Sequence, residues 1–140
     1  MPLKGYTSDC GRNDARIISR DRNSQRHHCG INKYGAYVTH YRIDGVVIVK
    51  GKKCDFLLIN EDKKTAYLIE IKGADLSEAA RQLAGTEEAL SEQLSGYSVH
   101  YRIVASKCKT QEIETASFKK FRLRWGRRLK YETGRIEEEI

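Results

Sequence analysis

The sequence predicts an α/β fold in which a central mixed β-sheet is flanked by helices. Two apolar segments, 54–59 and 66–73, lie on either side of a short polar loop, a pattern typical of two consecutive buried strands in a hairpin. An amphipathic segment, 75–94, follows, and then a further strand pattern at 97–104. Because a helix between two strands favours a parallel crossover, we expect both parallel and antiparallel pairs in the sheet.

The chain before the hairpin divides into two parts. Residues 1–35 are polar and rich in arginine, and Ile17 and Ile18 are their only brief apolar run, so we expect a basic arm, a short helix or an irregular loop. Strand patterns follow at 36–43 and 46–49. Together with the hairpin they indicate an antiparallel meander.

The hairpin loop determines which residues face one another across the two strands. The polar run 60–65 contains turn-forming residues, and a reversal centred on Asp62 and Lys63 sets Asp55 directly opposite Glu70. Opposed residues in an antiparallel pair have Cβ atoms roughly 4.5–5.5 Å apart. Two carboxylates at that spacing repel one another unless they share a cation.

This arrangement suits phosphodiester hydrolysis with Mg²⁺ or Mn²⁺. Asp55 and Glu70 supply carboxylates for the ion, and the Ile71 carbonyl is a further oxygen ligand. Lys72 lies two residues beyond Glu70, so it points to the same face and can orient a water molecule or stabilise the charge that develops on the phosphate. The alternative is a surface hairpin with a cross-strand Glu and Lys and no metal.

The segments that follow continue the pattern. Asp75 or Ser77 can cap the helix that we expect to run to about Leu94, and Gly85 is expected to kink or weaken it. Further along, 115–125 predicts a short basic helix with Trp125 in the core. A final strand at 128–131 and an acidic tail at 137–139 complete the expected elements.

Over about residues 37–105 the Asp-x14-Glu-x-Lys arrangement resembles the PD-(D/E)xK nuclease superfamily, which has the restriction endonuclease-like fold. The resemblance implies a restriction endonuclease-like core with the acid at the second core strand and Glu-x-Lys on the third. It implies that Asp55 and Glu70 are metal ligands and that Lys72 is the catalytic lysine. Gln82, on the following helix, resembles the glutamine that some members add to their site.

The chain departs from the family in its first half. Many members have a helical glutamate ahead of the core, yet residues 1–60 contain no Glu, and Cys54 replaces the proline of the family name. Asp44 is followed by Gly45, which most often marks a tight turn. The alternative is that Asp44 is an accessory acid replacing the missing glutamate. Asp9, Asp14 and Asp21 have less context for that role.

The charge of the chain favours a polyanionic partner. The net charge is +7 and the isoelectric point is about 9.3. An N-terminal stretch from Arg12 to His28 is also basic. Seven of the twelve residues from 119 to 130 are basic and are expected to contact nucleic acid: Lys119, Lys120, Arg122, Arg124, Arg127, Arg128 and Lys130.

Composition limits the remaining possibilities. A length of 140 residues predicts a single domain with a basic N-terminal part (1–35), a nuclease-like core (36–105) and a basic C-terminal extension with an acidic tail (106–140). No apolar run is long enough to cross a bilayer, so we expect a cytoplasmic protein without a membrane partner. The four scattered cysteines predict free thiols, and zinc binding by Cys10, His27, His28 and Cys29 is disfavoured because the spacing matches no common site.

The sequence therefore predicts a metal-dependent nuclease that acts on DNA in preference to RNA. No base-reading module is evident, which favours cleavage governed by the shape of the substrate, and dimerisation is an analogy only. The alternatives are a catalytically incomplete nucleic-acid binding module and a small protein-interaction subunit.

Overall fold

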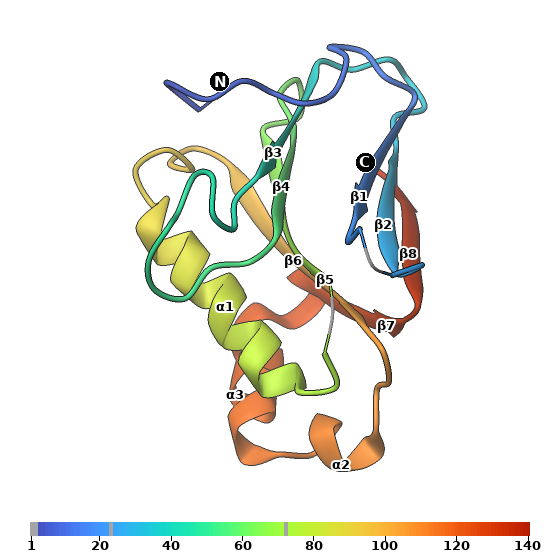
Figure 1. The fold of residues 1–140 in the computed structure, drawn as a ribbon, viewed down its shortest axis with the longest axis vertical. Coiled ribbons are helices and arrows are strands. Elements are labelled where there is room, and N and C mark those ends of the chain that lie inside the picture. The colour runs from blue at the N-terminus through green and yellow to red at the C-terminus, as the bar shows by residue number, and fades with distance from the viewer. Residues whose placement is uncertain (1–2, 23, 72) are drawn as a thin grey trace.

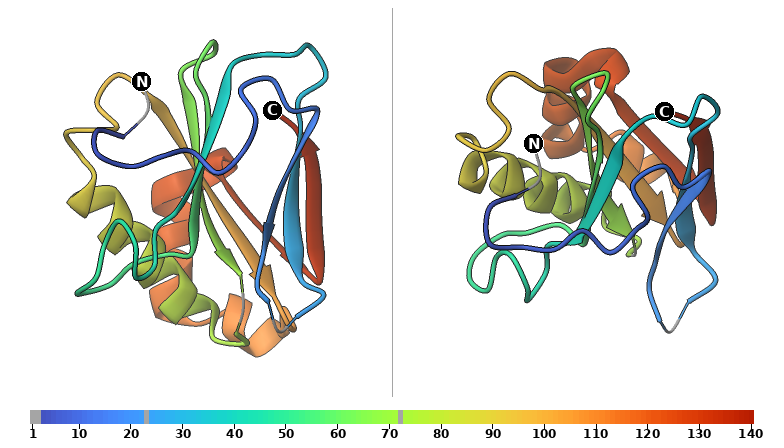
Figure 2. Two further views of the ribbon diagram at one scale, coloured as in Figure 1. Left: turned by 45° about the horizontal axis from the view of Figure 1, so that its top comes forward. Right: turned by 90° about the horizontal axis from the view of Figure 1, so that it is seen from above.

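The computed structural model describes residues 3–22, 24–71 and 73–140, which form three layers (Figure 1). A five-stranded sheet lies in the middle, helices cover one of its faces and a three-stranded sheet covers the other (Figure 2). The predicted α/β class with a mixed sheet is confirmed, but helices flank only one face. The central strands are β3 (Val38–Arg42), β4 (Phe56–Asn60), β5 (Thr65–Ile71), β6 (Ser98–Ala105) and β7 (Leu129–Thr133), in that spatial order.

The predicted hairpin register is confirmed along the paired strands. Phe56 pairs with Ile69 and Asn60 pairs with Thr65, as a turn centred on Asp62 and Lys63 requires. β3 pairs antiparallel with β4, so β3, β4 and β5 form an antiparallel meander as expected, but without the strand expected at 46–49. β6 and β7 then pair in parallel, so β4 runs opposite to the other four strands.

The predicted strand at 46–49 is wrong. Gly45, with φ of 78°, begins a compact turn in which the amides of Val46 and Val47 donate to the carbonyl oxygen of Ile43. Val46 and Val49 are 54% and 73% exposed, while Val47 and Ile48 are half-buried and pack against the edge of the core, so the run does not form a buried strand. The tight-turn interpretation of Asp44 and Gly45 is confirmed.

Helix α1 (Leu76–Ala89) begins at its predicted cap, where the Asp75 carboxylate accepts from the Glu78 amide at 2.9 Å. It ends five residues before the predicted end at Leu94. Gly85 allows close packing, because a Cβ there would lie 2.6 Å from the Lys52 carbonyl oxygen. The glycine therefore seats the loop between β3 and β4 against the helix.

The C-terminal half closes the helical layer and the sheet. A short helix α2 (Thr110–Ile113) precedes α3 (Ala116–Trp125), which Thr115 caps by accepting from the Phe118 amide. The 3₁₀ turn η1 (Gly126–Arg128) then leads into β7. Trp125 is 2% exposed and stacks on Tyr101 with ring centroids 3.9 Å apart, so its predicted place in the core is confirmed.

Both ends of the chain contribute to the three-stranded sheet, which the sequence did not predict. β1 (Arg16–Arg20) pairs antiparallel with β2 (His27–Ile31), and β2 pairs in parallel with β8 (Arg135–Glu139). The expected arm or helix within 1–35 and the expected acidic tail at 137–139 are therefore wrong. Ile136 and Ile140 are buried against the central sheet, which offsets the cost of ordering an acidic segment.

Two apolar cores separate the three layers. The core beneath the helices includes Leu57, Leu68 and Leu83, and the core between the sheets includes Leu58, Ile69 and Ile136. Neighbouring residues of β4 thus alternate between the two cores, because both faces of the central sheet are covered. This explains why its strands are almost continuously apolar.

Candidate functional site

Asp55 lies immediately before β4 and is bonded to the strands on both sides. Its carbonyl oxygen accepts from the Ile43 amide at 2.8 Å, and its own amide donates to the Ile69 carbonyl at 3.1 Å. Because Ile69 is also the register partner of Phe56, two residues of one strand face one of the other, which is a β-bulge. Asp55 is therefore displaced by one position from its predicted place directly opposite Glu70.

The Asp55 side chain is directed to the end of β5. Its Oδ2 accepts a hydrogen bond from the Ile71 amide at 2.8 Å. That amide belongs to the peptide group between Glu70 and Ile71, so the Asp55 carboxylate contacts the backbone directly after Glu70. The bulge thus connects the Asp55 side chain to the backbone of β5 directly after Glu70, a contact that a regular ladder would not provide.

Glu70 is 3% exposed, which is unusual for a carboxylate. It follows Leu68 by two residues on β5, so its side chain leaves the sheet on the side of α1. The predicted catalytic lysine, Lys72, lies outside the described residues.

Cys54 lies close to both acids. Its amide donates to Thr86 Oγ1 of α1 at 2.7 Å, and its thiol is fully buried. Burial raises the pKa of the Cys54 thiol to about 12, and the negative charges of Glu70 and Asp55 also raise it. The thiol is therefore protonated at neutral pH, and both carboxylates lie within electrostatic range of it.

Gln82 lies on α1 one turn before Thr86, and its carbonyl oxygen accepts from Thr86 Oγ1 at 3.0 Å. The Thr86 hydroxyl thus links the backbone of α1 to the Cys54 amide, one residue before Asp55. Gln82 is half-buried on this side of α1. Its predicted role in the site stays a prediction.

A cavity of about 70 Å³ opens beside the Asp55 carboxylate. Asp44, the predicted accessory acid, lines it, and so does Asp21, which had less support in the sequence. The structure also adds Arg20, which belongs to the basic N-terminal stretch, and Arg42, which the sequence did not single out. The lining residues are Arg20, Asp21, Arg42, Asp44, Asp55 and Phe56.

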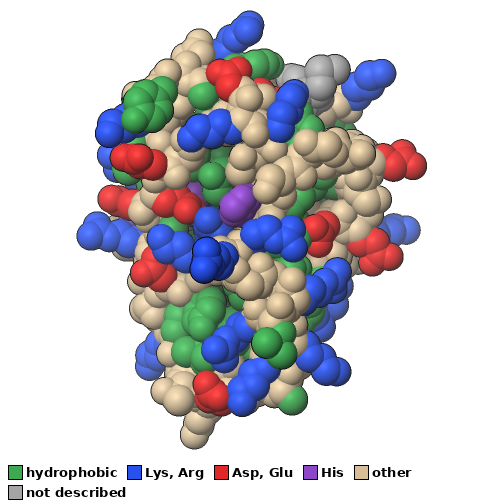
Figure 3. Space-filling model, turned by 180° about the vertical axis from the view of Figure 1, so that it is seen from behind, with side chains coloured by type: hydrophobic (Ala, Val, Ile, Leu, Met, Phe, Trp, Pro, Cys, Tyr) green, Lys and Arg blue, Asp and Glu red, His purple; other side chains and the backbone are tan. Residues whose placement is uncertain are grey.

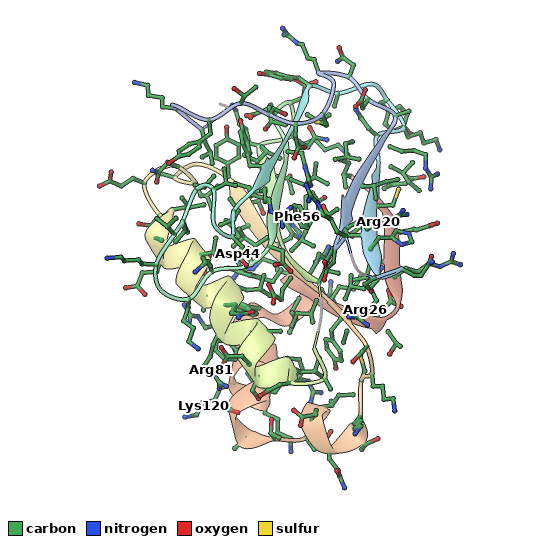
Figure 4. All side chains as sticks on the ribbon, viewed as in Figure 1. Arg20, Arg26, Asp44, Phe56, Arg81 and Lys120 are labelled. Carbon is green, nitrogen blue, oxygen red and sulfur yellow. The ribbon has the colours of Figure 1, made fainter. Side chains whose placement is uncertain are left out.

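These residues come from three separate parts of the chain. Arg20 ends β1 of the small sheet and Asp21 follows it, Arg42 ends β3, and Asp44 lies in the loop that leads to Asp55. In the view of Figure 4, Arg20 and Asp44 lie on either side of Phe56. Nothing in the local sequence indicates that the end of β1 meets the start of β4, because the contact forms between two sheets.

Among the residues that the structure describes, no three His, Cys, Asp or Glu side chains gather closely enough to hold a metal ion by themselves. The candidate donors are instead the carboxylates of Asp55 and Glu70 and the Ile71 carbonyl. His28, part of the disfavoured zinc interpretation, bonds to Glu138 at 2.7 Å. The four cysteines are free thiols, as predicted.

A Ser-His-Asp arrangement lies behind the same cavity. Ser19 Oγ is 2.7 Å from His40 Nε2, and His40 Nδ1 contacts an Asp9 carboxylate oxygen. The His40 ring stacks on Phe56, which lines the cavity. Ser19 is 0% exposed, so its hydroxyl cannot reach a substrate. The two contacts of His40 instead join β1 and the N-terminal segment to β3.

The seven C-terminal basic residues lie on α3, η1 and β7, away from the acidic cavity. Some are already engaged: Lys119 and Arg122 contact Glu114, Lys130 contacts Glu132, and the Arg128 guanidinium lies over the Tyr101 ring. On the face seen in Figure 3, Lys and Arg side chains are interspersed with Asp and Glu.

One group of cations lines a second cavity between α1 and α3. Arg81, Lys120 and Arg124 line this cavity of about 400 Å³ together with Ser117 and Phe121. Arg81 contacts Glu78 at 2.9 Å, whereas no ion pair joins Lys120 or Arg124 to another residue within 3–22, 24–71 and 73–140. Figure 4 shows Arg81 and Lys120 close together at this end of the helical layer.

Comparisons of the chain with protein-family models, with curated proteins and with solved structures give no match. Within the described part of the chain, no helix has both the length and the apolar character needed to cross a bilayer.

Proposed function

We propose that the protein is a metal-dependent nuclease that hydrolyses phosphodiester bonds of DNA on a restriction endonuclease-like core. The observation that carries this proposal is the 2.8 Å hydrogen bond from the Ile71 amide to Asp55, which joins an acid from the start of β4 to the backbone of β5 next to the buried Glu70. A buried carboxylate next to a second one is costly unless a cation or a donor compensates it.

The order of the central strands supports the proposal. The resemblance implies an acid at the second core strand and Glu-x-Lys on the third, and Asp55 precedes the second strand of the five while Glu70 lies on the third. The carboxyl ends of β3, β5 and β6 meet at the edge where these residues lie, and ligands of α/β sheets bind outside such edges. The departure is the small sheet that replaces helices on one face.

The donors at this edge fit a hard divalent cation. Mg²⁺ and Mn²⁺ prefer carboxylate and carbonyl oxygens, and a carboxylate that accepts one N–H retains further acceptor sites. Because N–H and C=O of a strand residue project to the same side, the Ile71 carbonyl faces the same edge of β5 as the amide that Asp55 binds. Asp55, Glu70 and Ile71 would hold the ion, and Asp44 is the accessory acid.

When bound, the ion polarises the phosphoryl oxygen and lowers the pKa of a water molecule. The protein itself would position the scissile phosphate at the cavity. Lys72 is proposed to orient the attacking water or to stabilise the charge that develops on the phosphate. The basic residues of α3 and η1 would neutralise backbone phosphates further along the DNA.

A catalytically incomplete nucleic-acid binding module is the second candidate. The same hydrogen bond from Ile71 favours it, because that bond gives Asp55 a structural role that needs no metal. The two candidates share their substrate and differ in whether the phosphodiester bond breaks.

Purified protein incubated with supercoiled, linear, single-stranded and branched DNA, and with RNA, distinguishes them. A nuclease cuts in Mg²⁺ or Mn²⁺, stops in EDTA, and loses activity in Glu70→Gln and Lys72→Ala. Asp62→Asn, at the loop end of the same hairpin, is the matched control and should cut normally. Retarded but intact DNA under all metal conditions would establish the binding module.

A further inference from the structure

We infer that Arg20 and Arg42 form a phosphate-binding pair at the acidic cavity, so that β1, outside the nuclease-like core, supplies part of the substrate site. The ligand is one phosphodiester group of a nucleic-acid backbone. This inference rests on the proposed function, because it names how the same site holds its substrate.

The two arginines face the cavity from different sheets. Arg20 is the last residue of β1 and Arg42 is the last residue of β3, and both line the space beside Asp55. Both side chains are exposed, so their guanidinium groups can reach a ligand at the mouth. The hydrogen bond between Ser19 and His40 joins β1 to β3 close to both arginines, and so fixes the separation of the pair.

Their hydrogen-bonding capacity is not used by the neighbouring acids. Three carboxylates line the same cavity, yet no ion pair joins Arg20 or Arg42 to any other residue of the described ranges. The Arg42 guanidinium instead lies 5.9 Å from the centre of the Phe56 ring. This cation–π contact restrains the side chain without consuming its N–H donors. Arginines that served only to neutralise Asp21, Asp44 and Asp55 would pair with them.

The two guanidinium groups select an anion as the ligand, and the acids beside them call for a cation. Three aspartates and two arginines give the lining a formal charge of −1. With the buried Glu70, the second proposed carboxylate ligand of the ion, one divalent cation would bring the site to neutrality, so a phosphodiester would not meet a net negative charge. The planar guanidinium fork also suits two oxygens of one phosphate.

The size of the cavity identifies which part of the nucleic acid enters. A cavity of about 70 Å³ holds only a few water-sized groups, since one water needs at least about 10–15 Å³. Phosphate oxygens fit this space, and a nucleobase does not. The pair therefore contacts the backbone, which carries no sequence information directly.

The test uses the full chain with Arg20→Ala, Arg42→Ala, the double variant, and Arg20→Lys. Arg16→Ala is the matched control, because Arg16 is an exposed arginine on the same strand that does not line the cavity. Three quantities are measured: Mn²⁺ affinity by electron paramagnetic resonance, affinity for a fluorescent single-stranded oligonucleotide in Ca²⁺, and the single-turnover cutting rate in Mg²⁺.

We expect each alanine variant to lose oligonucleotide affinity or cutting rate by about tenfold to a hundredfold, as for a charged hydrogen bond. Mn²⁺ affinity should be unchanged or higher, because a cation has been removed beside the acids. Arg20→Lys should recover part of the loss, and Arg16→Ala should behave as the unaltered protein.

The outcomes separate this inference from the proposed function. An unaltered protein that cuts, with a double variant that binds and cuts equally well, overturns the arginine pair and leaves the nuclease standing. An unaltered protein that binds the oligonucleotide through this pair but never cuts supports the pair and overturns the hydrolase. A double variant that loses Mn²⁺ as well overturns the pair, since the arginines then act only on the acids.

Discussion

The carboxylate of Asp55 accepts a hydrogen bond from the backbone amide of Ile71, 2.8 Å away across the end of the β4–β5 hairpin. Ile71 is fully buried, so its amide has no water to replace this acceptor. The residue proposed to bind the metal therefore also completes the hydrogen bonding of the strand that carries Glu70. Substitutions of Asp55 can distinguish its role in stability from its proposed role as a metal ligand.

Asp55→Asn should keep the acceptor oxygen and change the stability little, whereas Asp55→Ala leaves the Ile71 amide unsatisfied and should lower the free energy of unfolding by about 1–3 kcal/mol. Urea denaturation measures both. Metal-dependent cutting should disappear in both variants. An Asp55→Asn protein that cuts at the normal rate would show that the carboxylate is structural only.

The carboxyl group of Glu138 should make the free energy of unfolding depend on pH in the acid range. Burial alone would raise the pKa of this carboxyl, but hydrogen bonds from His28 and Arg102 outweigh burial and lower the pKa to about 2. Because the pKa is lower in the folded state, the contribution is complete above about pH 4.5 and is lost as the pH falls toward 2. It amounts to about 3 kcal/mol.

Urea denaturation between pH 2 and pH 7 measures this dependence. Glu138→Gln should flatten the curve between pH 4.5 and 2 and destabilise the protein at neutral pH. Glu139→Gln is the control, because Glu139 is exposed and its contact with Lys33 is 3.9 Å long. An unchanged acid limb in Glu138→Gln would contradict the prediction.

Gly85→Ala should destabilise the protein although alanine favours helices by about 1 kcal/mol over glycine. The new Cβ would lie 2.6 Å from the Lys52 carbonyl oxygen, so the loop carrying Asp44 must move, at a cost of about 1–3 kcal/mol. Thermal unfolding followed by circular dichroism measures the change. Glu88→Ala, on the exposed face of the same helix, should be nearly neutral.

Trp125 should report on the core and not on the substrate. It is the single tryptophan, it is 2% exposed, and it stacks on Tyr101. We expect weak quenching of its fluorescence by acrylamide, both without and with single-stranded DNA. Strong quenching by the oligonucleotide would instead indicate that Trp125 stacks on a base. Trp125→Ala should cost about 3–5 kcal/mol of stability.

The salt dependence of DNA affinity should distinguish engaged cations from available ones. Lys120→Ala and Arg124→Ala each remove a cation that makes no ion pair with a described residue, so each should reduce the slope of log affinity against log salt by about 0.9. Lys119→Ala should reduce it less, because Lys119 contacts Glu114 at 3.0 Å. If all three variants keep the slope of the unaltered protein, this surface does not contact DNA.

Local chemistry explains which elements could be predicted from the sequence. The polar loop around Asp62 sets the hairpin register, and Asp75 begins α1 because its carboxylate satisfies the free amide of Glu78. Such signals act over a few residues. The apolar run at 46–49 is not a strand, because strand propensity alone does not bury a segment and the turn at Gly45 leaves Val46 and Val49 exposed.

The candidate site could be predicted only in part. Asp55 and Glu70 lie on neighbouring strands of one hairpin, so their proximity follows from its turn, although the bulge that displaces Asp55 does not. The basic stretch from Arg12 to His28 includes Arg20, but its place beside Arg42 and Asp55 could not be predicted, because the contact forms only when the two sheets pack together.

By itself the sequence determined the hairpin register, the capped helix after it and the parallel crossover, since each depends on turn residues and on side-chain periodicity within one segment. Only the tertiary structure decided that His28 of β2 and Glu138 of β8 are neighbours and that Asp21 and Arg20 meet Asp44 and Asp55. The physical reason is that these contacts join segments far apart in the chain. They form because burial of two apolar faces brings the sheets together, and no local pattern names the partner.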